Sequence, residues 1–210
     1  MKKILILLSA ILFITGCTNV KDLNYDSIAN TISTEGLSPN EYRTGYKYFL
    51  PRGMQVSNSS LYNEVLDDGK YLYYLYVDII SYYKKNENTY QTNNNSVYSK
   101  RIDYDGKIGY IEVNLKENNK YLVEIMYNYA KIEVIVDKEN ISVSMLSAIN
   151  ILKSVEYNDN IIANILEDNI LSFKEEKFSI FETHSDDGYI QVIDDIDEVE
   201  DIIPDTDLIN

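Results

Sequence analysis

The chain has 210 residues, and its 34 acidic and 19 basic side chains give a formal charge of −15 at pH 7. Such a chain repels nucleic acid and is not attracted to an anionic bilayer, because both kinds of binding need clusters of Lys and Arg. Its single cysteine, Cys17, excludes a disulfide within the chain and a metal site built from several cysteines.

The first 14 residues carry the features of a secretory signal. Lys2 and Lys3 form a positive start, and a nearly unbroken apolar stretch of 11 residues follows from Ile4 to Ile14. A membrane-spanning helix needs roughly 20 apolar residues, so this stretch is too short for a permanent span. The pattern predicts a signal peptide that is removed from the mature protein.

The residues Ile14-Thr15-Gly16-Cys17 resemble the lipobox of bacterial lipoproteins. The resemblance implies that the thiol of Cys17 receives a diacylglyceryl group and that residues 1–16 are cleaved off as the signal peptide. The mature chain would then be held by lipid at the outer, extracytoplasmic face of a cell membrane. Two acyl chains anchor a protein stably, since each buried CH₂ contributes about 0.8 kcal/mol. An ordinary secretory signal with an incidental cysteine is the alternative.

A polar segment separates the signal peptide from the predicted domain. Residues 17–44, which begin with the lipidated Cys17, read as a tether because few of their positions follow a periodic pattern. The segment contains at most one weakly amphipathic helix, with apolar positions at Val20, Leu23, Ile28 and Ile32. The folded domain is expected to cover residues 45–181.

The first half of this domain reads as short strands joined by turns. The expected strands are residues 46–50, 54–56, 63–66 and 70–80. Every position from Tyr71 to Val77 is apolar or aromatic, which predicts a central strand covered on both faces. The tyrosines there would also suit a stacking surface for sugars or peptides, but tyrosine is equally typical of strands. Residues 84–96 are expected to form a polar loop.

An antiparallel meander is the clearest pattern in the chain. The four expected strands are residues 97–104, 107–116, 120–128 and 131–136. Asp105-Gly106 joins the first two and is typical of a type I′ hairpin turn. Within the second strand, alternation puts Ile111, Val113 and Leu115 on one face and Glu112, Asn114 and Lys116 on the other. The last two strands continue the same alternation.

Beyond residue 136 the apolar period changes to that of a helix. A helix over residues 140–153, with Asn140 as its N-cap, would place four apolar side chains on one face: Ile141, Met145, Ile149 and Leu152. A second helix is expected from Asn158 or Asp159, and a last strand over residues 177–181. The expected fold is therefore α+β, an antiparallel meander sheet covered by one or two helices.

Residues 45–157 resemble the PsbP-like fold. The resemblance rests on Leu50-Pro51-Arg52-Gly53-Met54, where an apolar strand ends, and on a helix that ends Ile149-Asn-Ile-Leu-Lys-Ser154. It implies an antiparallel sheet with helical cover and a role in binding or assembly. Members of that group share no catalytic residues, so the resemblance implies no catalytic residue, cofactor or ligand for this chain.

The C-terminal residues 182–210 read as an acidic tail. Lys177 is the last basic residue, and 11 acidic residues follow it. The run Asp194–Asp201 offers oxygen ligands that suit Ca²⁺, but it lacks the spacing of an EF-hand loop, so a disordered or loosely docked segment is expected. His184 is the only histidine, and without converging ligands or a marked nucleophile it predicts neither a metal site nor a catalytic triad.

Together these patterns predict a non-catalytic lipoprotein at the cell envelope, with no cofactor and no metal. Its partners would be the membrane, through lipid on Cys17, and an envelope protein that the sequence does not identify. The alternative is a lipoprotein that captures a small molecule or glycan and presents it to a transporter or wall enzyme. A deep pocket lined by the tyrosines of residues 71–83 would favour the alternative, and a flat, filled sheet would favour the first function.

Replacing Cys17 tests the lipid anchor. Cys17→Ser removes the thiol that the lipid would modify, so most of the protein should leave the membrane fraction for the medium, or accumulate as uncleaved precursor. Cell fractionation with immunoblotting measures this, and Thr18→Ser, which retains the thiol, is the matched control. If the cleaved Cys17→Ser chain stayed on the membrane as completely as the wild type, the anchor prediction would be wrong.

Overall fold

The computed structural model describes residues 20, 23–86 and 89–167, all of which belong to one compact unit. Several predictions fall elsewhere in the chain, namely the signal peptide with Cys17, the strand 177–181, and the acidic tail with His184. These lie outside the described residues. Within the described part, no helix has both the length and the apolar character needed to cross a membrane.

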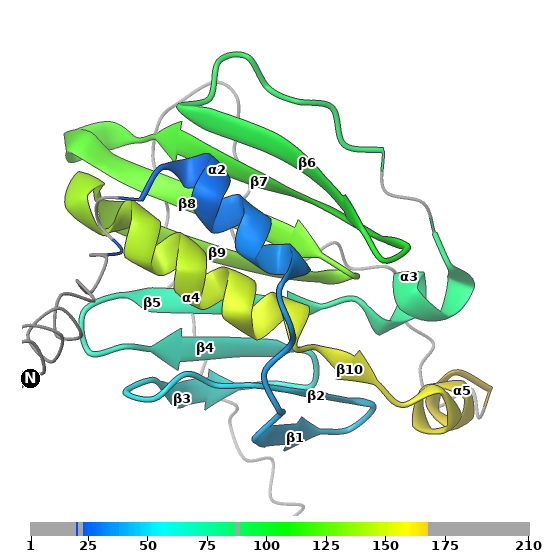
Figure 1. Cartoon of the computed structure of the whole chain (residues 1–210). Coiled ribbons are helices and arrows are strands. Elements are labelled where there is room, and N and C mark those ends of the chain that lie inside the picture. The colour runs from blue at the N-terminus through cyan, green and yellow to red at the C-terminus, as the bar shows by residue number, and fades with distance from the viewer. Residues whose placement is uncertain (1–19, 21–22, 87–88, 168–210) are drawn as a thin grey trace, which may run out of the picture. The chain divides into compact units, whose positions relative to one another are not determined.

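The centre of the domain is a seven-stranded antiparallel sheet (Figure 1). Its strands lie in the order β3-β4-β5-β9-β8-β7-β6. They are β3 (Gln55–Ser59), β4 (Asn63–Asp67), β5 (Leu72–Val77), β6 (Tyr98–Tyr104), β7 (Lys107–Leu115), β8 (Lys120–Tyr127) and β9 (Ala130–Asp137). Every neighbouring pair is antiparallel, so the predicted α+β fold with an antiparallel sheet is confirmed.

Two of the hairpins turn through residues in the left-handed region. Asp105-Gly106 connects β6 to β7 with φ of 54° and 70°, as the predicted type I′ turn requires. Asn128 and Tyr129 connect β8 to β9 with φ of 50° and 63°, although tyrosine rarely adopts this conformation. The Tyr157 hydroxyl donates to the Asn128 carbonyl oxygen at 2.7 Å, and the Asp78 amide donates to the Tyr129 carbonyl oxygen at 2.8 Å. These two bonds hold the turn.

The strand predicted for residues 70–80 is shorter than expected and is buried on one face. β5 ends at Val77, and Ile79–Lys84 form helix α3, which Asp78 caps through its side chain. Alternate side chains of β5 are buried, namely Tyr73, Leu75 and Val77, whereas Leu72 is 43% exposed. On the second face Tyr74 and Tyr76 are half-buried, so the predicted strand with both faces covered is only partly covered on one of them. Tyrosine carries both an apolar ring and a polar hydroxyl, so it also suits a half-buried position.

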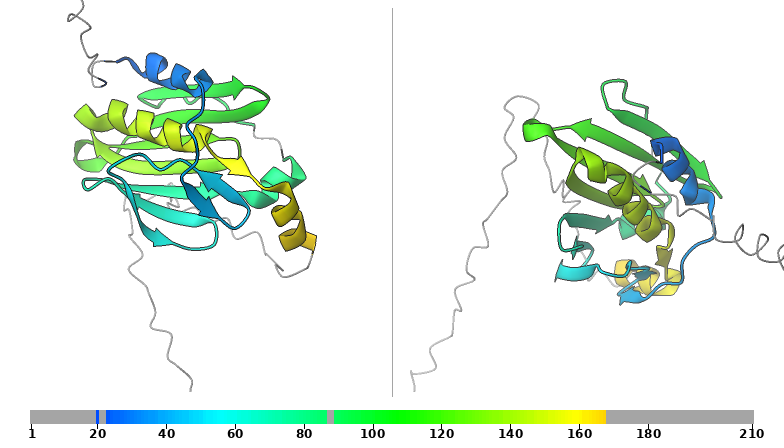
Figure 2. Two further views of the ribbon diagram at one scale, coloured as in Figure 1. Left: turned by 60° about the horizontal axis from the view of Figure 1, so that its bottom comes forward. Right: turned by 60° about the vertical axis from the view of Figure 1, so that its left-hand side comes forward.

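Helix α4 (Ile141–Lys153) covers one face of the large sheet (Figure 2). It packs against β8 and β9, and it is flanked by helix α2 (Tyr25–Ala29) and the 3₁₀ turn η2 (Asn30–Ser33). The predicted apolar stripe is buried, and the flanking elements bury further positions. The buried side chains of α4 are Ile141, Ser142, Ser144, Met145, Ala148, Ile149, Ile151 and Leu152.

Asn140 precedes α4 but does not cap it as predicted. A 3₁₀ turn, η4 (Lys138–Asn140), leads directly into the helix, so the Asn140 backbone already lies in the helical region, with φ −107° and ψ −1°. An N-cap side chain usually reaches the helix amides from an extended backbone. The Asn140 side chain makes no capping bond, and its Nδ2 atom is buried without a hydrogen-bond partner among the described residues.

Three short strands form a second sheet next to β4. They are β1 (Glu41–Arg43), β2 (Tyr46–Tyr48) and β10 (Glu156–Tyr157), and helix α5 (Asp159–Glu167) follows the last of them. The buried Glu64 carboxylate on β4 accepts from the Arg43 guanidinium at 2.6 Å and from the Tyr46 and Tyr48 hydroxyls at 2.8 Å each. Burial and the Glu64 charge raise the pKa of both tyrosines. This charge-assisted network joins the two sheets.

The domain begins before residue 45. Three side chains that the sequence assigned to the tether are buried in the same core as α4: Ile28, Ala29 and Ile32. The Leu23 carbonyl oxygen accepts a hydrogen bond from the Ser142 hydroxyl at 3.4 Å, and β1 starts at Glu41. The domain boundary therefore moves to Leu23. A few buried side chains in a polar stretch leave too weak a period for sequence analysis to detect.

Truncating the buried face of α4 tests the core. Ile149 and Leu152 are fully buried, so Ile149→Ala and Leu152→Ala should each lower the free energy of unfolding by about 2–5 kcal/mol through lost contacts and a cavity. Ser147→Ala and Asn150→Ala, at half-buried positions of the same helix, should change it by no more than about 0.5 kcal/mol. Urea unfolding of the four variants measures this, and equal tolerance at all four positions would contradict the packing of α4 on the sheet.

Candidate functional site

The face of the large sheet opposite α4 carries three carboxylates in a row. Glu112 on β7, Glu124 on β8 and Glu133 on β9 are directly opposite one another across neighbouring strands. The Cβ atoms of such partners lie about 4.5–5.5 Å apart, and like charges there are destabilising. We call these three residues the glutamate row. Helices α2 and α4 lie on the other face (Figure 2).

Glu112 accepts the most hydrogen bonds of the three residues in the glutamate row. Its carboxylate accepts from the Tyr90 hydroxyl at 2.7 Å and from Asn93, Ser96 and Asn114 at 2.9 Å each. Burial alone would raise the pKa of Glu112, but the hydrogen bonds outweigh burial and hold the pKa below its usual value. Because three of the donors belong to the segment before β6, the charged Glu112 fastens that segment to the sheet.

Glu124 and Glu133 have fewer donors. Glu133 is only 4% exposed, and its Oε1 accepts from Lys131 at 2.6 Å, but its Oε2 has no hydrogen-bond partner among the described residues. Glu124 accepts from the Tyr110 hydroxyl. Burial raises the pKa of Glu124, and the nearby Glu133 adds to this against the opposing effects of Tyr110 and Lys131. Two carboxylates on paired positions repel each other, so the Glu124 carboxyl, with its raised pKa, keeps its proton to a higher pH than an exposed glutamate.

Sequence reasoning placed Glu112 on the face opposite Ile111 and Val113, which the structure confirms, but it missed the glutamate row. Alternation within a strand shows which face a residue takes, not which residue of the next strand lies opposite. The turns between β7, β8 and β9 set that register. Counting residues along each strand from those turns would have placed the three glutamates opposite one another.

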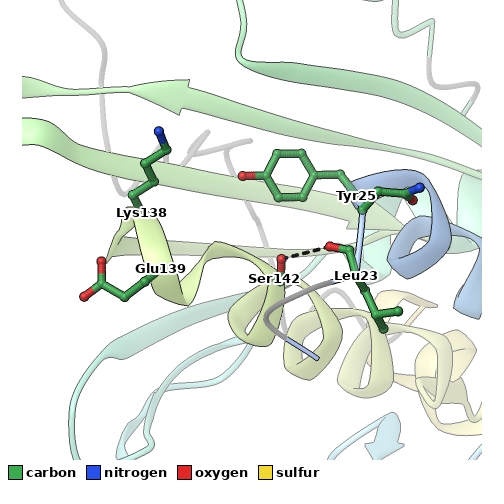
Figure 3. Close-up of a pocket in the computed structure, with 6 residues that line it drawn as sticks. Leu23, Tyr25, Lys138, Glu139 and Ser142 are labelled. Atoms are coloured by element: carbon green, nitrogen blue, oxygen red, sulfur yellow. Dashed lines mark hydrogen bonds between the residues drawn. The ribbon is translucent and has the colours of Figure 1, made fainter. Parts of the chain in front are cut away.

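A cavity of about 580 Å³ opens where α2 and α4 begin (Figure 3). Its lining residues are Leu23, Asn24, Tyr25, Lys138, Glu139 and Ser142. In Figure 3, Lys138 and Glu139 project from η4, and the Tyr25 ring extends toward them from the start of α2. The cavity therefore lies where the chain enters the domain, six residues after Cys17 at Leu23.

A second cavity, of about 450 Å³, lies between the segment after η2, the β6–β7 turn and the end of α4. Tyr104, Tyr127 and Lys153 are among its lining residues. The Lys153 ammonium donates to the Thr34 hydroxyl at 2.7 Å and to the Thr31 carbonyl oxygen at 3.3 Å, and among the described residues it has no carboxylate partner. Burial lowers the pKa of Lys153. The cavity is also lined by Glu35, Asp105, Lys107 and Glu156, so its charges are mixed and it suits a small polar ligand.

Neither of these two cavities is lined by the tyrosines of residues 71–83. Tyr71 and Tyr73 use their hydroxyls within the domain, where Tyr71 donates to Asp137 at 2.7 Å and Tyr73 donates to Ser144 at 3.0 Å. In the part of the chain that the structure describes, no three His, Cys, Asp or Glu side chains are grouped so as to hold a metal ion.

No protein-family model, curated protein or solved structure matches this chain. The resemblance of residues 45–157 to the PsbP-like fold therefore stays a prediction, as does the resemblance of Ile14–Cys17 to a lipobox. An antiparallel sheet with helical cover is compatible with the first of these, but unrelated proteins with different functions share that architecture.

Removing the charge of Glu124 should stabilise the domain at neutral pH. Because burial raises the pKa of Glu124 in the folded state, the contribution of this residue to stability is greatest in acid. That contribution is lost as the pH rises above the usual glutamate value of 4.5 and through the folded pKa. Glu124→Gln keeps an acceptor for Tyr110 and should raise the free energy of unfolding at neutral pH by roughly 0.2–1 kcal/mol, the size of one cross-strand pair. Urea unfolding in acid and at neutral pH measures this.

Glu112→Gln is the matched control, because its effect should have the opposite sign. The pKa of Glu112 is lowered in the folded state, so its contribution is present at neutral pH and is lost as the pH falls. Glu112→Gln should therefore destabilise the domain at neutral pH and matter little in acid. A Glu124→Gln variant that is less stable than the wild type at neutral pH would contradict this description of the glutamate row.

Proposed function

We propose that this protein is a lipoprotein held at the outer face of a cell membrane by lipid on Cys17, and that its domain binds a protein partner of the cell envelope without catalysing a reaction. The observation that carries the proposal is the lipobox-like Ile14–Cys17, which is followed six residues later by Leu23, where the domain begins. Six residues span at most about 22 Å, so the lipid would hold the domain beside the bilayer.

The hydrogen bonding of the ionisable groups supports a binding role. Glu64 and Glu112 are each surrounded by donors from their own domain, and Asp137 accepts from Lys120 at 2.7 Å. Burial raises the pKa of Tyr82 and of Tyr127 to about 12, so both hydroxyls keep their protons at neutral pH. A general acid or base works best with a pKa near the working pH, which the pKa values of these two tyrosines do not approach.

The exposed tyrosines are the first places to look for the partner. Tyr42 on β1 is 69% exposed and Tyr104 at the end of β6 is 44% exposed. Tyrosine is enriched where proteins contact one another, because its ring contributes area and its hydroxyl can hydrogen-bond at a wet interface. A photo-crosslinking phenylalanine derivative has a similar size and suits both positions.

A second function, capture of a small polar ligand, is favoured by the cavity at Lys153. The cavity volume of about 450 Å³ falls in the range of small-molecule sites, which is roughly 300–1,000 Å³. A lipoprotein with such a site would pass its ligand to a transporter or wall enzyme. The two functions differ in what stays bound to the purified protein, either another protein or a small molecule.

Photo-crosslinking in intact cells tests the proposed partner. With the crosslinker at position 42 or 104 of the otherwise wild-type chain, irradiation should produce one discrete protein adduct from at least one position, identified by mass spectrometry. The adduct should decrease several-fold when Cys17→Ser is added, because the unanchored chain is diluted away from the envelope. If neither position yields an adduct, or if the adduct is unaffected by Cys17→Ser, the proposal is contradicted.

Native mass spectrometry of the chain purified from cells separates the second function from the first. A bound small molecule that is lost in Lys153→Met, but kept in the control Lys116→Met outside both cavities, would favour ligand capture. A chain that carries no small molecule, together with a discrete protein adduct, would favour the protein partner.

A further inference from the structure

Three connections of the domain lie at the same end of the strands of the large sheet, close to the start of α2. They are the β4–β5 turn (residues 68–71), the 3₁₀ turn η3 (Glu117–Asn119) and η4 (Lys138–Asn140). Asp137 joins them, because it accepts from Lys120 and from the Tyr71 hydroxyl at 2.7 Å each and lies 3.8 Å from Lys70. We call this side of the domain, where the strand ends and their connections lie on the left of Figure 1, the anchor edge.

The chain from Cys17 arrives at the anchor edge. Leu23 packs against the core, its carbonyl oxygen bonds to Ser142 in the first turn of α4, and the cavity of Figure 3 separates it from η4. A lipid on Cys17 would therefore lie no more than about 22 Å from this edge. The opposite edge, with the β6–β7 turn and α3, lies one strand length away, about 30 Å for the nine residues of β7.

Large apolar side chains are exposed along the anchor edge. Leu115 at the end of β7 is 56% exposed, Val97 before β6 is 50% exposed, and Leu72 at the start of β5 is 43% exposed. Val143, in the first turn of α4, is exposed as well. The antiparallel register brings these positions to one side, because Val97 bonds to Val113 and Leu115 pairs with Tyr121. The opposite end also exposes large side chains, among them Leu61 and Tyr83. The short link from Leu23 to Cys17 is therefore what assigns the bilayer to the anchor edge, where apolar side chains can enter the headgroup region.

The charges of the anchor edge nearly cancel. Its basic residues are Lys70, Lys116, Lys120 and Lys138, and its acidic residues are Asp67, Asp68, Glu117, Asp137 and Glu139. Such an edge is not attracted electrostatically to an anionic bilayer, which agrees with the acidic character of the whole chain. The lysines can still extend their ammonium groups to lipid headgroups while their stems lie beside apolar surface.

We infer that the anchor edge faces the membrane and touches its headgroup region, and that the opposite edge, with Tyr104 and the Asn128-Tyr129 turn, points away from it. This inference rests on the proposed lipid anchor at Cys17 and adds the orientation of the domain. The membrane is the occupant of the anchor edge, and an approaching protein would meet the opposite edge first. Tyr104 lies on that side and is 44% exposed.

Depth-dependent fluorescence quenching tests the orientation. Cys17 is the only cysteine and would be acylated, so a new cysteine can be labelled alone. Leu115→Cys on the anchor edge and Tyr104→Cys on the opposite edge are labelled with the same fluorophore in the full, lipidated chain. The chain is placed in phosphatidylethanolamine–phosphatidylglycerol vesicles with or without nitroxide-headgroup lipid. Quenching should be several-fold stronger at Leu115→Cys, and equal thermal unfolding of the two variants controls for folding.

The outcomes separate the inference from the function on which it rests. Stronger quenching at Leu115→Cys supports the orientation. Equal or reversed quenching, with the protein still floating with the vesicles, overturns the orientation and leaves the lipid anchor intact. A third outcome combines two measurements: quenching in vesicles is weak and equal at both positions, but the label at Leu115→Cys is protected from soluble iodide in intact cells. That result would overturn the orientation in favour of a protein partner at the anchor edge. A chain purified from membranes without lipid on Cys17 would overturn the proposed function and the orientation together.

Discussion

The packing of α4 against β8 and β9 is the interaction on which the rest of the domain depends. Ile149 and Leu152 on the helix, and Val123 and Ile132 on the strands, have no exposed surface. Burial of one such side chain contributes about 1.5–3 kcal/mol, and no disulfide is available to replace that contribution in a chain with one cysteine. Once α4 occupies this face, α2, η2 and the second sheet complete the core around it.

The apolar face of the large sheet that α4 covers determines which residues lie on the opposite face. Side chains alternate along a strand, so a continuous apolar face across β7, β8 and β9 sends Glu112, Glu124 and Glu133 to the opposite side together. Repulsion among these three carboxylates is reduced in two ways: four hydrogen-bond donors surround Glu112, and the pKa of Glu124 is raised. The glutamate row therefore couples stability to pH in two opposite directions, through the lowered pKa of Glu112 and the raised pKa of Glu124.

Local periodicity accounts for what the sequence predicted well. The meander and α4 follow from alternation and from the spacing of Ile141 to Leu152, and both are present. Long-range features were missed, including the burial of Ile28 beside α4, the second sheet around Glu64, and the register of the glutamate row. Gly109 is another, because a Cβ there would overlap the Met126 carbonyl oxygen of β8, a contact that only the paired strands reveal.

The central claim is that lipid on Cys17 holds this domain at the membrane, and the mass of the mature N-terminal peptide tests it most directly. The protein would be extracted with detergent from the membranes of its own cells, digested, and analysed by mass spectrometry. We expect a first peptide that begins at Cys17 and carries the mass of a diacylglyceryl group, with or without a further acyl chain. An unmodified Cys17, or a chain that still begins at Met1, would contradict it.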